Sequence, residues 1–170
     1  NKCLHGVPGI CFALVRESAF ESKKTGSSSV YLDLFRYRQE QKNGFSPFTQ
    51  SVQAMFALQE ALRELADGGG WEKRHAHYRT LTAHVMSGLA EMGIEILLES
   101  PKAYSSILTS YHLPPNMKYE ALHDTLKQKG FVIYAGQGRL APGIFRIAHM
   151  GDISADDLDR LCAALRTAIR

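Results

Sequence analysis

The sequence predicts an α/β protein in two parts, mostly helical up to residue 69 and a compact α/β unit from residue 70 onward. Three observations predict this architecture. Apolar residues recur at helical spacing in two long stretches, and the triplet Gly68-Gly69-Gly70 separates those stretches. Short apolar runs then alternate with helical patterns in the last part of the chain. We therefore expect two domains, residues 1–69 and residues 70–170.

The first domain is expected to be helical around a single strand. The predicted strand is the apolar run at 10–15, which follows a loop rich in glycine and proline. Short helices are predicted over 17–25 and 31–41, with a polar break at 26–29 between them. A long helix after Thr49 carries an apolar stripe that we expect to face the core: Val52, Met55, Leu58, Leu62 and Leu65.

The second domain is expected to begin with a long helix and to continue as an α/β unit. One face of that helix carries five large apolar side chains, those of Tyr78, Leu81, Val85, Leu89 and Met92. Strands are predicted at 94–98, 106–111, 131–134 and 144–148, with a helix over 119–129. Ser154 and Asp157 stand at capping-box positions before a final helix whose inward side chains are Leu158, Leu161 and Leu165.

The composition is that of an ordinary globular protein. The 170 residues are 45% hydrophobic and carry a formal net charge of +3, which is ordinary for a globular protein. Basic residues are scattered among acids, so neither nucleic acid nor a membrane is indicated as a partner, and the clusters at 23–24 and 36–38 are expected on solvated faces. Cys3, Cys11 and Cys162 lack metal-ligand or disulfide spacing, which favours a reducing cytoplasm. The chain does not start with methionine, so we expect residues upstream of it.

Two possible ligand motifs are weak. The segment 136–141 fits a dinucleotide fingerprint, but a strand is predicted where the phosphate-binding helix should begin. His75 and His77 do not share a helix face, and His77 and His84 lie two turns apart, so no metal site is predicted.

Lys2 occupies an unusual place for a lysine. It precedes a turn-forming Gly-Val-Pro-Gly segment and the predicted strand, so we expect it on an ordered loop at the edge of the core. Desolvation there lowers the pKa of an amine, and the neutral amine is the nucleophile that forms Schiff bases. From the residues alone, a structural role for Lys2 is as well supported as a catalytic one.

Five segments with known counterparts occur in order along the chain: NKCLHGVPGICFALVR, YLDLFRYRQEQ, GFSPFTQSVQAMFALQEAL, GFVIYAG and IFRIAHMGDI. Together they resemble motifs of the class V, fold-type I aminotransferases, which use pyridoxal 5'-phosphate (PLP). Within that class the similarity is greatest to the 2-aminoethylphosphonate–pyruvate transaminases. The resemblance implies the C-terminal part of a fold-type I PLP-dependent transferase, with the end of the large domain in 1–69 and the small α/β domain in 70–170.

The resemblance also assigns roles to three residues. Lys2 matches the lysine that bonds the cofactor covalently and then transfers a proton. Thr49 matches the threonine that reaches the cofactor phosphate of the neighbouring subunit, which implies a homodimer with shared active sites. Arg146 matches the arginine that binds the substrate anion, a task suited to a bidentate guanidinium. Phe145 and Ile147 should point to the other side of the strand, and an ion pair with a nearby acid is the structural alternative for Arg146.

The implied reaction moves an amino group from 2-aminoethylphosphonate to pyruvate, giving phosphonoacetaldehyde and L-alanine. An alanine–glyoxylate or serine–pyruvate type enzyme of the same class is the alternative, and a non-catalytic dimerisation or binding module is the alternative from another class. Four residues depart from the family pattern and bear on the choice of amino donor: Phe48, Ala135, Ala148 and His149. The other cofactor contacts of this fold precede the lysine, so the 170-residue segment alone is expected to be inactive.

Overall fold

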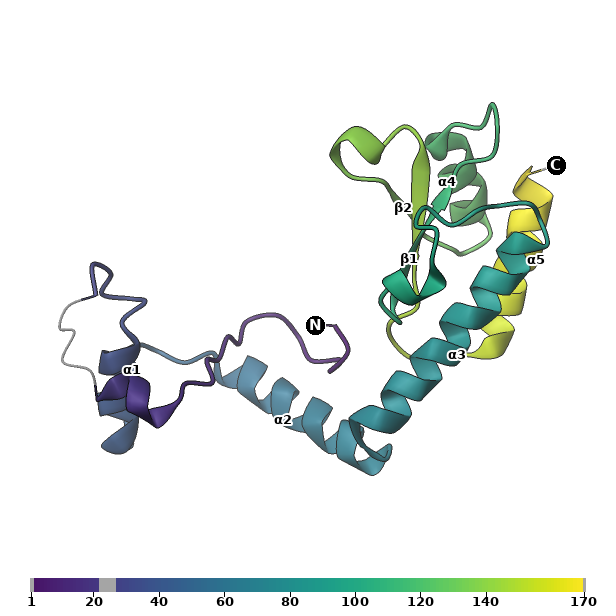
Figure 1. Cartoon of the computed structure of the whole chain (residues 1–170). Helices are drawn as coiled ribbons and strands as arrows, with labels where there is room; N and C mark the ends of the chain where they lie inside the picture. The colour runs from purple at the N-terminus through teal and green to yellow at the C-terminus, as the bar shows by residue number, and fades with distance from the viewer. Residues whose placement is uncertain (1, 22–26, 170) are drawn as a thin grey trace. The chain divides into compact units, whose positions relative to one another are not determined.

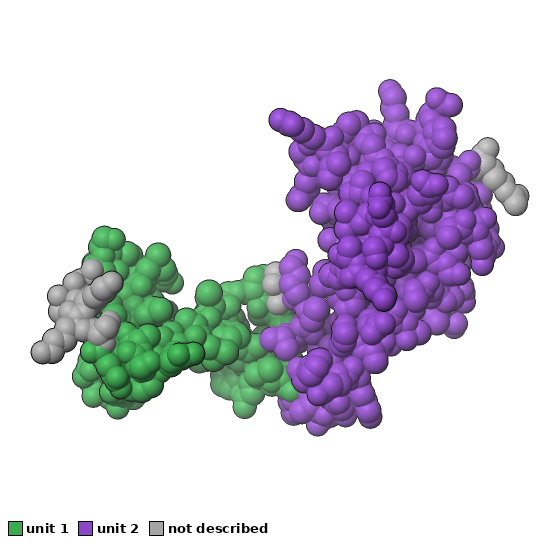
Figure 2. All heavy atoms as spheres, in the orientation of Figure 1, with its two compact units in different colours: residues 1, 6–62 green, residues 2–5, 63–170 purple. Residues whose placement is uncertain are grey.

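The computed structural model of the chain describes residues 2–21 and 27–169 (Figure 1). These residues form two compact units, coloured separately in Figure 2. Unit 1 comprises residues 6–62, and unit 2 comprises 2–5 together with 63–170. The expected domain boundary after residue 69 concerns the whole transferase fold and stays a prediction.

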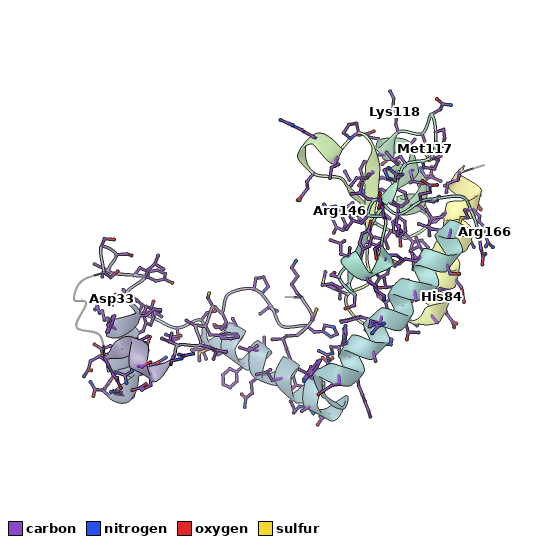
Figure 3. All side chains as sticks on the ribbon, in the orientation of Figure 1. Asp33, His84, Met117, Lys118, Arg146 and Arg166 are labelled. Carbon is purple, nitrogen blue, oxygen red and sulfur yellow. The ribbon has the colours of Figure 1, made fainter. Side chains whose placement is uncertain are left out.

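Unit 1 contains the short helix η1 (Glu17–Phe20), helix α1 (Leu34–Lys42) and most of helix α2 (Val52–Asp67). Helix α1 begins three residues later than predicted because Asp33, labelled in Figure 3, caps it. Its Oδ1 accepts hydrogen bonds from the backbone N–H groups of Phe35 at 3.0 Å and Arg36 at 3.3 Å. Of the helix predicted over 17–25, the structure shows η1 followed by a turn at Glu21, and residues 22–25, with the basic pair at 23–24, lie outside the described residues.

The strand predicted at residues 10–15 does not form. This segment belongs to no helix or strand, and its side chains from residue 11 onward are exposed, with Phe12 68% and Leu14 93% exposed. A strand is stable only when its N–H and C=O groups pair with a neighbour, and no described segment of the chain pairs with this one. The prediction was wrong because the segment has the apolar composition of a buried strand but no neighbouring strand to pair with among the described residues.

The apolar stripe predicted as the buried face of α2 is also largely wrong. Its members Val52, Met55 and Leu62 are each at least 47% exposed, whereas the small residues Ala54 and Ala61 are buried. The glycine loop lies against these alanines: a Cβ on Gly9 would stand 3.3 Å from Cβ of Ala54, and one on Gly6 would stand 3.8 Å from Cβ of Ala61. The loop can approach α2 this closely because it presents glycines and the helix presents alanines. These small residues therefore determine which face of α2 the loop covers.

The glycine triplet ends α2 as predicted. The helix stops at Asp67, and Gly69 and Gly70 adopt φ angles of +89° and +86°. These left-handed conformations suit glycine and turn the chain into helix α3 (Gly70–Ala90).

Unit 2 packs three helices and a small antiparallel sheet around one core (Figure 1). The sheet has the order β1-β3-β2, with β1 at Leu108–His112, β2 at Tyr134–Ala135 and β3 at Ile144–Ala148. Helices α3, α4 (Tyr119–Gln128) and α5 (Ala155–Ile169) contribute the apolar faces. The predicted stripes are confirmed here except at Met92, which follows the end of α3 and is only partly buried. The buried residues include Tyr78, Leu81, Val85, Leu89, Leu158, Leu161 and Leu165.

Three of the four predicted strands differ from the observed ones, and β1 begins two residues later than the strand predicted at 106–111. Residues 94–98 contribute only an isolated bridge from Ile96 to Tyr111, although Leu97 N–H also donates to the Ser110 carbonyl at 3.0 Å. The strand predicted at 131–134 starts only at Tyr134. The N–H of Phe131 instead bonds the Leu126 carbonyl at 2.9 Å and closes the end of α4, so this residue belongs to a helix cap.

Helix α5 begins at the predicted capping box. Ser154 Oγ accepts from the Asp157 N–H at 3.2 Å, and the Asp157 carboxylate accepts from the Ser154 N–H at 3.0 Å and its hydroxyl at 2.7 Å. These hydrogen bonds from Ser154 hold the pKa of the Asp157 carboxyl below its ordinary value. Aspartate therefore completes the box although glutamate or glutamine is the commoner residue at that position.

Candidate functional site

Lys2 begins a tight turn in unit 2. The N–H of His5 donates to the Lys2 carbonyl at 3.1 Å, and His5 has a φ of +63°. The Lys2 side chain is exposed, so the predicted burial at a core edge is wrong for the described chain. Within residues 2–21 and 27–169 the Lys2 amine has no hydrogen-bond or ion-pair partner.

A network of side chains holds this turn in place. Arg74 Nη1 donates to the Cys3 carbonyl at 3.0 Å, and its Nη2 donates to Glu64 Oε1 at 2.8 Å. The same Glu64 oxygen lies 3.2 Å from Nδ1 of His5, so Nδ1 carries the proton and donates. His5 Nε2 then accepts from the hydroxyl of Tyr78.

The Tyr78 hydroxyl also accepts from the backbone N–H of Gly151 at 3.4 Å. Tyr78 is only 2% exposed, and the Arg74 side chain only 14%. A cavity of about 580 Å³ lies beside the network and is also lined by Lys73, His77 and Asp152. Sequence reasoning missed this network because its members come from four separate segments of the chain, and because it assigned Tyr78 to the core alone.

Arg146 lies on the central strand β3 of the unit 2 sheet (Figure 3). Its neighbours Phe145 and Ile147 are 0% and 4% exposed, whereas Arg146 is partly exposed. Nε of Arg146 donates to the carbonyl of Ala135 on β2 at 2.8 Å. In the described part of the chain no acid pairs with Arg146, and its two terminal nitrogens have no protein acceptor, so they can form a bidentate contact with an anion.

Thr49 lies in unit 1, in the loop before α2, and its side chain is exposed. The preceding residues form a turn in which Ser46 Oγ donates to the Phe48 carbonyl at 2.8 Å. Phe48, which departs from the family pattern, packs with ring centroids 5.1 Å from Tyr31 and 5.9 Å from Tyr37. Phe48 therefore packs in an aromatic cluster with Tyr31 and Tyr37, next to Thr49 in the chain.

The departures at Ala148 and His149 follow Arg146 at the end of β3. His149 is fully buried, and its Nδ1 lies 3.3 Å from Oγ1 of Thr82. Burial lowers the pKa of His149 to about 4, so the ring is neutral near pH 7. This histidine therefore packs in the core of unit 2.

Among the described residues, no hydrogen bond or ion pair joins Lys2 to Arg146, and Thr49 belongs to the other unit. No group of three or more histidine, cysteine or acidic side chains in that same part of the chain could hold a metal ion. None of its helices combines the length and apolar character needed to cross a bilayer.

The comparison with curated proteins shows that this sequence is similar to known transaminases. Over 173 aligned positions, it is 35% identical to the 2-aminoethylphosphonate–pyruvate transaminase of Salmonella schwarzengrund, covering 99% of this chain and 47% of the relative. The chain resembles the C-terminal half of this transaminase. It thus spans about half the length of the curated relatives it matches. No protein-family model matches it.

Solved aminotransferases share the fold. The aspartate aminotransferase of Thermus thermophilus superposes with a TM-score of 0.72 at 26% identity, covering 83% of this chain and 39% of the neighbour. An alanine–glyoxylate aminotransferase from Nostoc superposes with a TM-score of 0.78 at 21% identity, covering 88% and 40%. The chain therefore has the fold of the C-terminal part of a fold-type I PLP aminotransferase, as the sequence predicted.

Proposed function

We propose that this protein, in its natural full length, is a PLP-dependent aminotransferase that moves an amino group from 2-aminoethylphosphonate to pyruvate. The products are phosphonoacetaldehyde and L-alanine. The observation that carries the proposal is the 35% identity to a 2-aminoethylphosphonate–pyruvate transaminase, sustained over 99% of the chain. This region includes Lys2, Thr49 and Arg146, the three residues to which the proposal gives roles.

The residues present fit the proposed cofactor. Lys2 offers an exposed amine without a protein partner in the described chain, as a covalent bond to an aldehyde requires. Thr49 offers an exposed hydroxyl that can donate to a phosphate oxygen. PLP, when bound, supplies the electron sink that lets a proton leave the carbon bearing the substrate amine. Nζ of Lys2 would take up that proton and return it, acting as base and then as acid.

Arg146 is proposed to bind the substrate anion. Its Nε bond to the Ala135 carbonyl restrains the guanidinium, and the two terminal nitrogens are left to donate to a bound anion. Phosphonate and carboxylate each present two oxygens to such a pair of donors, so one arginine can serve both substrates. This dual use agrees with a reaction that takes an aminophosphonate and a 2-oxo acid in turn.

We further propose a homodimer with shared active sites in the cytoplasm. Unit 1 exposes large apolar side chains that a partner surface would cover, among them Phe12, Leu14, Val30, Leu32 and Phe45. Cys3 and Cys11 are free and exposed, which agrees with a reducing compartment. Sedimentation of the purified protein tests the oligomeric state.

The reaction is tested by supplying the full-length protein with PLP and comparing amino donors. We expect L-alanine to form from pyruvate when 2-aminoethylphosphonate is present. Turnover restricted to alanine or serine with glyoxylate would instead identify the related enzyme type of the same class. Failure to retain PLP through gel filtration would support a non-catalytic binding or dimerisation module.

A further inference from the structure

The turn that carries Lys2 is held on both of its sides. On one side the Cys3 carbonyl accepts from Arg74, and on the other the His5 ring contacts both Glu64 and Tyr78. The backbone bond from His5 N–H to the Lys2 carbonyl closes the turn between these two anchors. The path of the chain immediately after Lys2 is thereby fixed against α3.

The anchors form one connected network. Arg74 and His5 share the same Glu64 oxygen, so a single carboxylate orients the guanidinium and the imidazole together. The hydroxyl of Tyr78 gives its proton to His5 and accepts that of Gly151 N–H. Gly151 follows β3, which carries Arg146, so the Tyr78 hydroxyl connects the turn of Lys2 to the loop after the strand of Arg146.

We propose that Arg74 and Tyr78 are positioning residues for Lys2, which rests on the function proposed above. They act through the Cys3 carbonyl and the His5 ring, and neither residue needs to touch cofactor or substrate. An exposed lysine on a loose loop spreads its amine over many orientations, and ordering the backbone beside it reduces that spread. The network therefore supplies the order that burial does not give to Lys2.

The hydroxyl of Tyr78 can be removed without changing the packing of its ring. Tyr78→Phe retains the buried aromatic ring and deletes only the contacts to His5 and Gly151. Tyr104→Phe is the matched control, because the Tyr104 hydroxyl also bonds backbone groups, Leu98 N–H and the Ser110 carbonyl, that lie away from the turn. Arg74→Gln removes the second anchor, and Arg166→Gln is its control because Arg166 pairs with Glu91 between α5 and the end of α3.

The first measurement is hydrogen–deuterium exchange of the segment containing residues 2–6 in the full-length protein without cofactor. Tyr78→Phe and Arg74→Gln are each expected to speed this exchange about two- to tenfold, the range for the loss of one net hydrogen bond. Tyr104→Phe and Arg166→Gln should leave it unchanged. The proposal is overturned if the turn exchanges at the same rate in both test variants as in the two control variants. If Tyr78→Phe does not fold, Arg74→Gln decides the question.

The second measurement separates positioning from general stability. The four variants and the unsubstituted protein are incubated with PLP, reduced with borohydride and digested, and the phosphopyridoxyl label on the Lys2 peptide is measured by mass spectrometry. We expect Lys2 to be labelled more slowly in the two test variants than in the two controls, although the melting temperatures of all four variants are the same. Equal labelling rates in all variants overturn the positioning role. Absence of label on Lys2 in the unsubstituted protein overturns the proposed function, while the exchange data still report whether Arg74 and Tyr78 hold the turn.

Discussion

Nδ1 of His149 lies 3.3 Å from Oγ1 of Thr82 inside the core of unit 2. Thr82 gives its only hydroxyl proton to the Ser106 carbonyl at 2.8 Å. The Thr82 oxygen must therefore accept from His149, which places the imidazole proton on Nδ1. Nε2 is then an unprotonated nitrogen, buried and without a partner among the described residues.

This arrangement predicts a loss of stability in weak acid. The pKa of His149 is about 4 in the folded protein and about 6.5 when unfolded, so the unfolded chain binds the extra proton first as pH falls. The stabilisation is complete above about pH 6.5 and is lost progressively towards pH 4, by up to about 3 kcal/mol. Urea unfolding at several pH values measures it. His149→Gln should flatten this part of the profile, and an unchanged profile would contradict the prediction.

Lys2→Ala is expected to abolish the borohydride-stable PLP adduct, because Lys2 is the only residue proposed to bond the cofactor covalently. Mass spectrometry of the reduced and digested full-length protein checks this. Lys73→Ala is the control, since Lys73 lines the neighbouring cavity and has no proposed bond to PLP. An adduct that persists on another lysine in Lys2→Ala would refute the assignment.

Arg146→Lys is expected to weaken substrate binding by about 1.5–3 kcal/mol, because a lysine cannot form two parallel hydrogen bonds to one anionic group. Apparent affinities for 2-aminoethylphosphonate and for pyruvate measure the effect. Arg166→Lys is the control, because Arg166, labelled in Figure 3, forms an exposed ion pair with Glu91. Unchanged affinity for both substrates in Arg146→Lys would remove Arg146 from the binding site.

Ser154→Ala is expected to lower the free energy of unfolding by about 0.5–2 kcal/mol, since it breaks the capping box at the start of α5. Denaturant unfolding of the chain measures the change. Ser100→Ala is the control, because Ser100 precedes a short 3₁₀ helix without making a side-chain cap bond. Equal stability of the two variants would show that the box contributes nothing measurable.

Gly88→Ala should destabilise the protein although alanine favours helix formation. A Cβ at position 88 in α3 would stand 2.7 Å from Sγ of Cys162 in α5, so either this buried thiol must leave its rotamer or the helices must move apart. Overpacking of this kind costs about 1–3 kcal/mol, more than the gain of about 1 kcal/mol in helix propensity. Thermal unfolding compares it with Gly143→Ala, where a Cβ meets no atom within 4 Å. A stabilised Gly88→Ala would disprove the close contact.

The sequence by itself determined the elements that local chemistry dictates. The capping box at Ser154, the stop at Gly68–Gly70 and the stripes of α3 and α5 depend on residues close together in the chain, and all of them formed as predicted. The resemblance, carried by five ordered motifs, was sufficient to predict the aminotransferase fold.

Only the tertiary structure decided which apolar faces are covered and what surrounds the candidate site. Apolar residues at 10–15 and along α2 have the composition of a core, but burial requires a packing partner, and close approach of Gly6 and Gly9 to Ala54 and Ala61 selected a different face. The network of His5, Glu64, Arg74 and Tyr78 joins residues up to 73 positions apart. Periodicity reports one helix or strand at a time, so contacts between distant segments become visible only when the chain is folded.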